Sequence, residues 1–166
     1  MIELVNVKKG FGAKVVVNGV SAVMKSSTTN LIIGSSGSGK TVLLKCMIGL
    51  FKPDEGQVLY EGIDLYGMNE GQLKEVRKQI GMLFQGSALF DSKTVKENVQ
   101  FPLDMFTNFT TLEKEKRVDE VLERVRIEGA HLKSPSEISG GMKKRVALAR
   151  AIVLNPKYLF CDEPNS

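Results

Sequence analysis

The sequence contains no apolar run long enough to cross a bilayer, because Lys45 and Lys52 interrupt its most hydrophobic stretch. Residues 1–4 lack the charged and then apolar pattern that opens a secretory signal peptide. The formal net charge is +4, but no block of Lys and Arg is long enough to suggest a nucleic-acid-binding arm. We therefore expect a cytosolic chain that binds no nucleic acid and reaches a membrane only through a partner.

Cysteine and histidine are also scarce. The two cysteines, Cys46 and Cys161, each lie within an apolar segment, so we interpret both as core thiols rather than as a disulfide or a metal pair. The single histidine, His131, is interpreted as a surface residue near a helix end. What is present, 42% hydrophobic and 25% charged residues in a chain of 166, is ordinary for a soluble globular protein.

The most informative stretch fits the phosphate-binding pattern G-x-x-x-x-G-K-[ST] at every fixed position. It consists of Gly34, Ser35, Ser36, Gly37, Ser38, Gly39, Lys40 and Thr41. The apolar residues 30–33 before it are expected to form a buried strand, and residues 41–50 a helix. The glycines and the helix N-terminus would bind phosphate, Lys40 would reach the β- and γ-phosphates, and Thr41 would bind Mg²⁺. A flexible Gly/Ser loop is the alternative.

Strand and helix patterns alternate along the chain, which predicts an α/β fold with a parallel core. Strands are expected at residues 2–7, 15–17 and 20–24, broken by Gly10, Gly12 and Gly19, and again at 57–60, 63–65, 80–84 and 157–161. Asn69 and Gln72 indicate a capped helix that runs to about Gln79.

Residues 86–138 have helical patterns only, at residues 93–100 and 111–126. Ser139 is expected to cap a further helix that runs to about Leu154. We therefore predict a nucleotide-binding core with a β subdomain at residues 1–85, a helical subdomain at 86–138, and a return to the core at 139–166.

Asp162 and Glu163 follow the last predicted strand. A carboxylate at the carboxyl end of a buried parallel strand lies beside the ligand in open α/β sheets. We expect Asp162 to hold Mg²⁺ through its water shell and Glu163 to polarise the attacking water as a general base. An ordinary acidic turn before Pro164 is the alternative.

Ser139, Gly140 and Gly141 form a second polar glycine turn at a helix start, and so a second candidate anion site. Two such sites can act on one triphosphate only if two copies of the chain face each other. A simple helix cap is the alternative.

The sequence resembles the ABC-type ATPase family over essentially the whole chain. The resemblance rests on four motifs in a fixed order: residues 34–41, Gln85, residues 139–141 and residues 162–163. The resemblance implies that they are its Walker A loop, Q-loop glutamine, signature motif and Walker B strand. It implies a P-loop NTPase fold with a RecA-like parallel core, an antiparallel β subdomain and an inserted helical subdomain.

The same resemblance assigns roles to individual residues. ATP and Mg²⁺ would be the cofactors, with Thr41, Gln85 and Asp162 around the metal and Lys40, Gln85 and Glu163 in catalysis. Phe11 lies where the family stacks an aromatic ring on adenine; a core aromatic of the first sheet is the alternative.

Two stretches resemble more narrowly the ATPases of MCE- and Mla-type phospholipid transporters: residues 84–91, and the signature, in which Met142 replaces the usual Gln. This implies a subunit that energises lipid transport at the cytoplasmic face of the inner membrane. Its partners would be a second, head-to-tail copy, membrane-embedded permease subunits and an MCE-domain lipid-binding protein, with coupling through residues 85–91.

The sequence ends at Ser166, before the D-loop and the switch histidine of the family. We therefore expect a chain truncated after the Walker B strand that binds ATP without useful turnover. A non-transport ABC-type ATPase acting on ribosomes or DNA, and a nucleotide binder without turnover, are the alternative functions.

Overall fold

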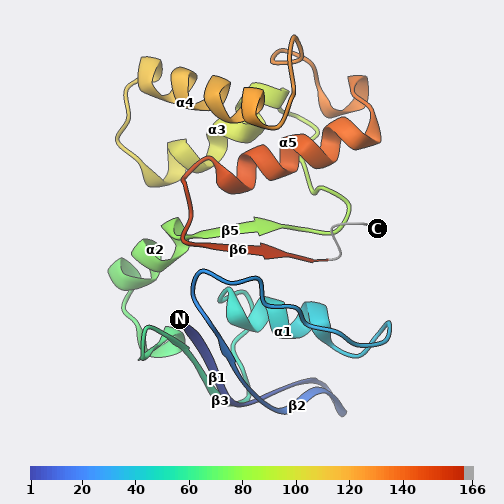
Figure 1. Cartoon of the computed structure of the whole chain (residues 1–166). Coiled ribbons are helices and arrows are strands. Elements are labelled where there is room, and N and C mark those ends of the chain that lie inside the picture. The colour runs from blue at the N-terminus through green and yellow to red at the C-terminus, as the bar shows by residue number, and fades with distance from the viewer. Residues whose placement is uncertain (163–166) are drawn as a thin grey trace. The chain divides into compact units, whose positions relative to one another are not determined.

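A computed structural model describes residues 1–162 of the chain, which divides into two compact units, Met1–Leu73 and Lys74–Ser166. Figure 1 shows the order of the elements along the chain. Within the described residues, no helix is both long enough and apolar enough to cross a membrane.

The first unit is built on an antiparallel sheet with the strand order β2-β1-β3-β4. Its strands are β1 (Ile2–Phe11), β2 (Lys14–Met24), β3 (Glu55–Tyr60) and β4 (Ile63–Asp64), followed by the short 3-10 helix η1 (Leu65–Gly67). Ile2 and Leu4 of β1 are at most 3% exposed, as expected where alternate side chains of a strand enter the core, and Val7, beyond a shift in register, is also buried. Helix α1 (Lys40–Met47) contacts β1 and β2.

The first two strands are longer than the sequence predicts. Gly10 and Gly19 do not break them; Gly10 lies within β1 and Gly19, with φ of 68°, within β2. The β1–β2 register instead shifts at several points between Leu4 and Gly10, so the extra residues are accommodated as bulges and pairing continues on both sides. Only the predicted break at Gly12 is a turn.

The prediction of a strand at residues 30–33 is wrong. No strand is assigned there, and the side chains of Leu31 and Ile33 are 79% and 85% exposed. An apolar run becomes a strand only when neighbouring backbones supply its hydrogen bonds, and a run of four residues carries no information about which neighbour that is.

The second unit contains a parallel pair of strands, β5 (Ile80–Leu83) and β6 (Tyr158–Cys161), preceded by α2 (Glu70–Lys78). Asn69 and Gln72 cap α2 reciprocally, as the sequence predicts: the Asn69 N–H donates to the Gln72 side chain, and the Gln72 N–H to the Asn69 side chain, each at 3.0 Å. Helix α5 (Gly140–Ile152) contacts β5, and α3 (Val95–Phe106) and α4 (Thr111–Arg124) pack beyond it (Figure 1).

The predicted helical segment shares its core with α5: Val99 of α3, Leu122 of α4 and Val146 of α5 belong to one cluster and are fully buried. Capping boxes start α3 at Thr94 and α4 at Thr110. Helix α3 runs past residue 100, where we expected it to end, because its buried face continues through Leu103 although Pro102 removes one backbone donor.

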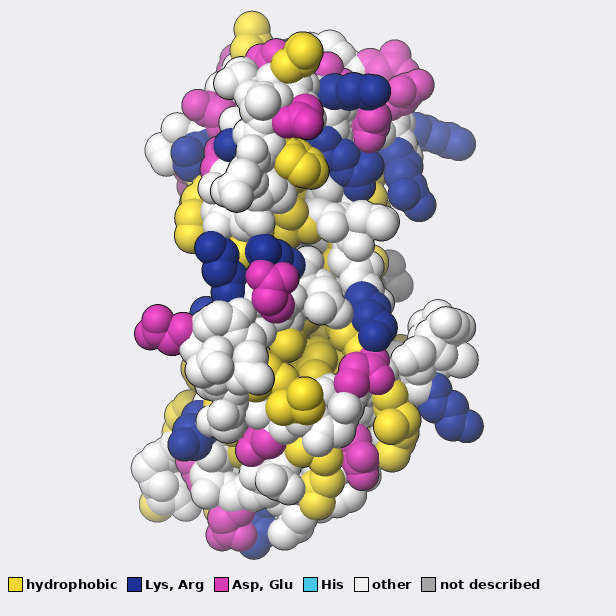
Figure 2. Space-filling view, turned by 90° about the vertical axis from the view of Figure 1, so that its left-hand side faces the viewer, with side chains coloured by type: hydrophobic (Ala, Val, Ile, Leu, Met, Phe, Trp, Pro, Cys, Tyr) yellow, Lys and Arg dark blue, Asp and Glu magenta, His cyan; other side chains and the backbone are white. Residues whose placement is uncertain are grey.

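Charged side chains of both signs cover the outside of these helices, and they are interspersed at the top of the view in Figure 2. Several are paired: Lys96 with Glu115, Lys114 with Asp104, and Arg117 with Glu120, at N···O distances between 2.7 and 3.1 Å. In each pair the cation is partly buried and the carboxylate is exposed to solvent, so each pair adds little stability, on the order of 0–1 kcal/mol.

The cysteine prediction is half right. Cys46 in α1 is fully buried, but Cys161 at the end of β6 is exposed, together with Leu159, whereas Phe160 between them is buried. Successive side chains of a strand point to opposite faces, and an apolar run alone does not reveal that one face is open.

Candidate nucleotide-binding site

The glycine loop of the first unit folds around the ammonium group of Lys40. The Nζ atom of Lys40 donates to the carbonyl oxygens of Gly34 and Ser35, each at 2.9 Å. The N–H of Ser38 closes a turn on the Ser35 carbonyl at 3.2 Å. The lysine thus lies inside the loop formed by residues 34–38, where a bound phosphate would meet a fixed positive charge.

Helix α1 starts directly behind this loop. Its N-cap is Gly39, with φ of 94°, and no side chain caps the helix. A Cβ atom at Gly39 would lie 2.7 Å from the Val16 carbonyl oxygen of β2, so only glycine allows the loop to approach the sheet this closely. The first turn contains Thr41 and no acidic residue, which leaves the helix N-terminus suited to an anion.

Two tyrosines anchor the other end of α1. The hydroxyl of Tyr60 donates to the Met47 carbonyl at 2.8 Å, and that of Tyr66 donates to the carbonyls of Cys46, at 2.7 Å, and Phe51. Burial raises the pKa of Tyr66, so its hydroxyl stays protonated as a donor. These bonds satisfy carbonyl groups that the end of a helix leaves open, and they hold α1 in place behind the loop.

Phe11 ends β1 at the tip of the β1–β2 hairpin and is 47% exposed. Its ring meets Phe51 edge-on, with centroids 5.4 Å apart. Asp54 fixes this tip by accepting from Lys9 Nζ at 2.6 Å and from the Gly10 N–H at 2.7 Å, and the Lys9 hydrogen bond holds the pKa of Asp54 below its usual range. The ring of Phe11 thus packs against Phe51 while part of its surface stays accessible at the tip of the hairpin.

The structure brings Gln85 and Asp162 to the same edge of the parallel pair in the second unit. They follow β5 and β6 at the carboxyl ends, and the Asp162 N–H donates to the Leu83 carbonyl at 2.9 Å. Asp162 is 4% exposed and Gln85 is exposed. Glu163, the expected general base, lies outside the described residues.

Gln85 and Asp162 of the second unit offer an amide and a carboxylate oxygen, and Thr41 of the first unit offers a hydroxyl oxygen. Such hard oxygen donors suit Mg²⁺, which usually keeps several waters and needs few protein ligands. No group of three or more His, Cys, Asp or Glu residues arranged for a metal occurs in residues 1–162, so no competing metal centre of that kind is present there.

The signature residues form the N-terminus of α5. The Ser139 side chain accepts from the Met142 N–H at 3.2 Å, and Gly140 and Gly141 open the helix. Ser139, Gly140 and Gly141 are exposed, and the first turn has no acidic residue. This end of α5 is therefore open to an anion carried by another molecule.

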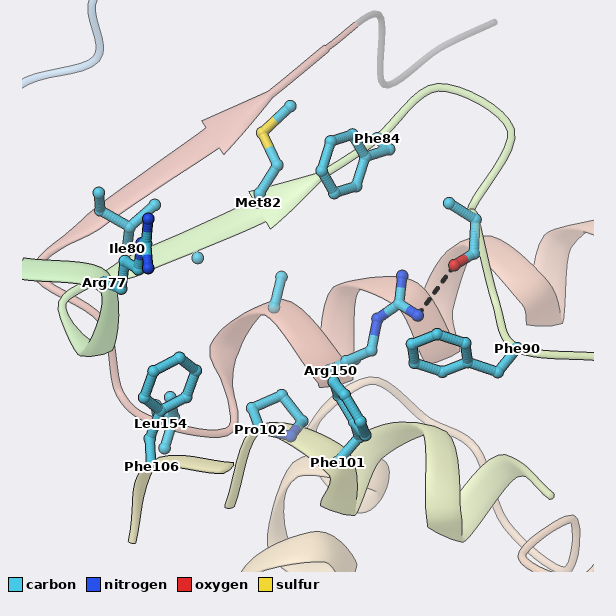
Figure 3. Close-up of a pocket in the computed structure, with 13 residues that line it drawn as sticks. Arg77, Ile80, Met82, Phe84, Phe90, Phe101, Pro102, Phe106, Arg150 and Leu154 are labelled. Atoms are coloured by element: carbon cyan, nitrogen blue, oxygen red, sulfur yellow. Dashed lines mark hydrogen bonds between the residues drawn. The ribbon is translucent and has the colours of Figure 1, made fainter. Parts of the chain in front are cut away.

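Sequence reasoning missed two polar residues of the second unit, Arg150 and Asn98. Arg150 lies four residues after the buried Val146 and three before the buried Val153, so helical spacing places it on the apolar face of α5. A charged residue in that position could have been recognised in the sequence as one that needs a buried partner. It borders an apolar cavity of about 280 Å³ (Figure 3). Other residues that line the cavity are Ile80, Met82 and Phe84 around β5, and Phe101, Pro102 and Phe106 of α3.

Comparison with known proteins gives concordant results. A family model described as ABC transporter matches residues 17–166. The methionine import ATP-binding protein MetN 1 of Oceanobacillus iheyensis is 45% identical over all of this chain and 50% of its own length. The probable ribonucleotide transport ATP-binding protein mkl of Mycobacterium leprae is 40% identical over 99% of this chain and 48% of its own. The chain thus spans about half the length of these curated relatives.

Solved structures extend the likeness to the fold. The dimeric structure of the bacterial ABC transporter cassette MJ0796 matches with a TM-score of 0.90 and 33% identity, over 99% of this chain and 74% of the other. A post-hydrolysis dimer of the same cassette, bound to ADP and Pi, matches with a TM-score of 0.89 and 32% identity, over 99% of this chain and 75% of the other. The predicted P-loop NTPase fold with an antiparallel β subdomain and helices is confirmed.

Proposed function

Since the chain belongs to the ABC transporter family, we propose that it is the ATP-binding and ATP-hydrolysing part of a transport system. The observation that carries this proposal is the loop of residues 34–38 closed around Lys40, directly in front of the uncapped N-terminus of α1. That arrangement combines a fixed cation with the positive end of a helix dipole, both of which favour a triphosphate.

In this proposal each residue has a separate task. Lys40 neutralises charge on the β- and γ-phosphates, and Phe11 stacks on the adenine ring. Thr41, Gln85 and Asp162 would hold Mg²⁺, which when bound neutralises the phosphate oxygens. Glu163 accepts a proton from the attacking water. Catalysis is mainly electrostatic, because phosphoryl transfer depends on positioning and on charge stabilisation.

We place a second copy of the chain opposite the first, in a head-to-tail pair. The exposed N-terminus of α5, with Ser139, Gly140 and Gly141, has no acidic residue in its first turn and suits the γ-phosphate bound to the other copy.

Membrane-embedded permease subunits at the cytoplasmic face of the inner membrane would be the further partners. Coupling to them would run through residues 85–91, where Leu89 packs into the helical core and Phe90 is 39% exposed.

Replacing the general base tests the hydrolytic part of this proposal. In the full-length protein, Glu163→Gln should keep ATP affinity within about twofold and lower phosphate release by at least about a hundredfold, because an amide cannot accept the proton. It should also accumulate an ATP-bound dimer, seen as a larger species by size-exclusion chromatography. Phosphate release near the wild-type rate would remove Glu163 from this role.

For the transported molecule, we propose a lipid, with an MCE-domain lipid-binding protein as an additional partner. The support is the likeness of residues 84–91 and of the Met142-containing signature to ATPases of phospholipid systems. The named relatives point elsewhere, to methionine and to ribonucleotides, so the cargo needs its own test.

That test compares cargoes in liposomes that contain the full-length protein and its membrane subunits. We expect ATP-dependent movement of a labelled phospholipid and no accumulation of labelled methionine or ribonucleotide, with Lys40→Ala as the inactive control. ATP-dependent uptake of methionine or of a ribonucleotide without lipid movement would overturn the lipid assignment and leave the ATPase assignment intact.

A further inference from the structure

The backbone directly after Gln85 has an unusual conformation. Gly86, Ser87 and Ala88 follow one another with φ of 75°, 68° and 44°. Positive φ is unfavourable for residues that carry a Cβ atom, and two such residues in succession need an external hold. Within residues 1–162, the backbone hydrogen bonds of the turn itself are local: the Ser87 N–H donates to the Phe84 carbonyl at 3.3 Å and the Ala88 N–H to the Gly86 carbonyl at 2.9 Å.

Arg150 of α5 supplies that hold. Its two terminal nitrogens donate to the carbonyl oxygens of Ala88, at 2.9 Å, and Ser87, at 3.0 Å. The guanidinium group also lies over the ring of Phe90, 5.5 Å from its centroid, and Figure 3 shows it between this ring and the turn. The planar fork of an arginine can bind both carbonyls at once, which the single ammonium group of a lysine does less well.

The far end of the same segment is held separately. The side chain of Asn98 is fully buried; its oxygen accepts from the Phe90 N–H at 2.8 Å, and its amide donates to the carbonyls of Phe90, Lys93 and Thr94 at 3.0–3.1 Å. Residues 90–94 are thus fixed to α3, whereas residues 87–88 are fixed to α5. The turn nearest Gln85 is therefore held in place by Arg150 and not by Asn98.

We propose that Arg150 is a positioning residue for Gln85: it holds the strained turn of residues 86–88 against α5 and so keeps Gln85 at the carboxyl end of β5, beside Asp162. The metal-binding role of Gln85 rests on the proposed function; the hold on the turn does not. Helix α5 begins at the signature residues 139–141, so one helix carries both the signature and the residue that positions Gln85.

Hydrogen exchange tests the hold directly. In Arg150→Ala, the amides of residues 84–91 should exchange at least about tenfold faster than in the wild type, and Arg150→Lys should be intermediate. Adding Ala88→Gly to Arg150→Ala should restore about fivefold protection, because glycine adopts positive φ without the cost that alanine meets. A loss of α5 packing alone would not be repaired by glycine at residue 88.

Arg117→Ala is the matched control. Arg117 also donates to two backbone carbonyls near the end of α5, those of Val153 at 2.8 Å and Ile152 at 3.4 Å, but it does not bind the turn. It should lower the melting temperature without changing exchange in residues 84–91. Equal exchange of this segment in Arg150→Ala and wild type, or equal acceleration in Arg117→Ala, would overturn the proposal.

Calorimetry tests the consequence for the site. Arg150→Ala should bind ATP with wild-type affinity in EDTA. In Mg²⁺, its ATP affinity should be roughly tenfold below that of the wild type, and the same is expected of Gln85→Ala. The double variant should lose no more than Gln85→Ala alone, since both changes act on one group. Additive losses in the double variant would show that Arg150 does not act through Gln85.

The two proposals fail on different results. If the wild-type chain binds no ATP, the proposed function fails, and the metal-binding role of Gln85 fails with it. If hydrogen exchange of residues 84–91 is unchanged in Arg150→Ala, only the positioning role of Arg150 fails.

Discussion

Replacing Lys40 with alanine should raise the Kd of the chain for ATP by about ten- to a hundredfold. The change removes the ammonium group that the carbonyls of Gly34 and Ser35 hold inside the loop, each at 2.9 Å. A hydrogen bond to a charged group contributes about 1.5–3 kcal/mol, which corresponds to this range of affinity. Isothermal titration calorimetry with ATP measures it directly.

Lys45→Ala is the control for Lys40→Ala. Lys45 lies in the last turn of the same helix, with its ammonium group 5.4 Å from the centroid of the Phe51 ring, away from the loop. It should leave ATP affinity unchanged. Both variants should melt within a few degrees of the wild type, because neither side chain is part of the core. Equal affinity of Lys40→Ala and wild type would show that the loop does not bind the phosphates.

Replacing Gly81 with alanine should be among the most destabilising single changes in the second unit. A Cβ atom at Gly81 would lie 2.3 Å from the carbonyl oxygen of Ala151 in α5, which is backbone and cannot rotate away. Strand β5 and α5 would have to separate. Overpacking of this kind costs about 1–3 kcal/mol and sometimes more, so the melting temperature of this 166-residue chain should fall by about 2–12 °C.

The matched control is Gly71→Ala in α2. A Cβ atom there would only make an ordinary contact with the Asn69 side chain, at 3.4 Å, and α2 has no buried residue. Gly71 lies in the first turn of α2, where replacing glycine with alanine should gain no more than the roughly 0.5–1 kcal/mol seen in helix interiors, so this variant should melt at or slightly above the wild-type temperature. Thermal unfolding followed by circular dichroism compares the two. A Gly81→Ala protein as stable as the wild type would contradict the close packing of β5 on α5.

The mispredicted features of this chain all depend on contacts between residues distant in the sequence. Residues 30–33 have the composition of a buried strand, but strand formation needs a paired neighbour. Gly10 and Gly19 look like breaks in the sequence, yet pairing on both sides carries β1 and β2 through them as bulges. Cys161 belongs to an apolar run whose open face only the packed structure reveals.

The sequence alone determined the features whose physical cause is local. The reciprocal cap at Asn69 and Gln72 and the cap at Ser139 join residues three positions apart, and the contacts of Lys40 in the loop of residues 34–41 span at most six. Each of these features lies where its pattern predicts. The tertiary structure alone decided which backbone groups meet across the chain. Arg150 reaches carbonyls more than sixty positions away, at Ser87 and Ala88, and no spacing rule links such residues, because only packing of α5 on β5 brings them together.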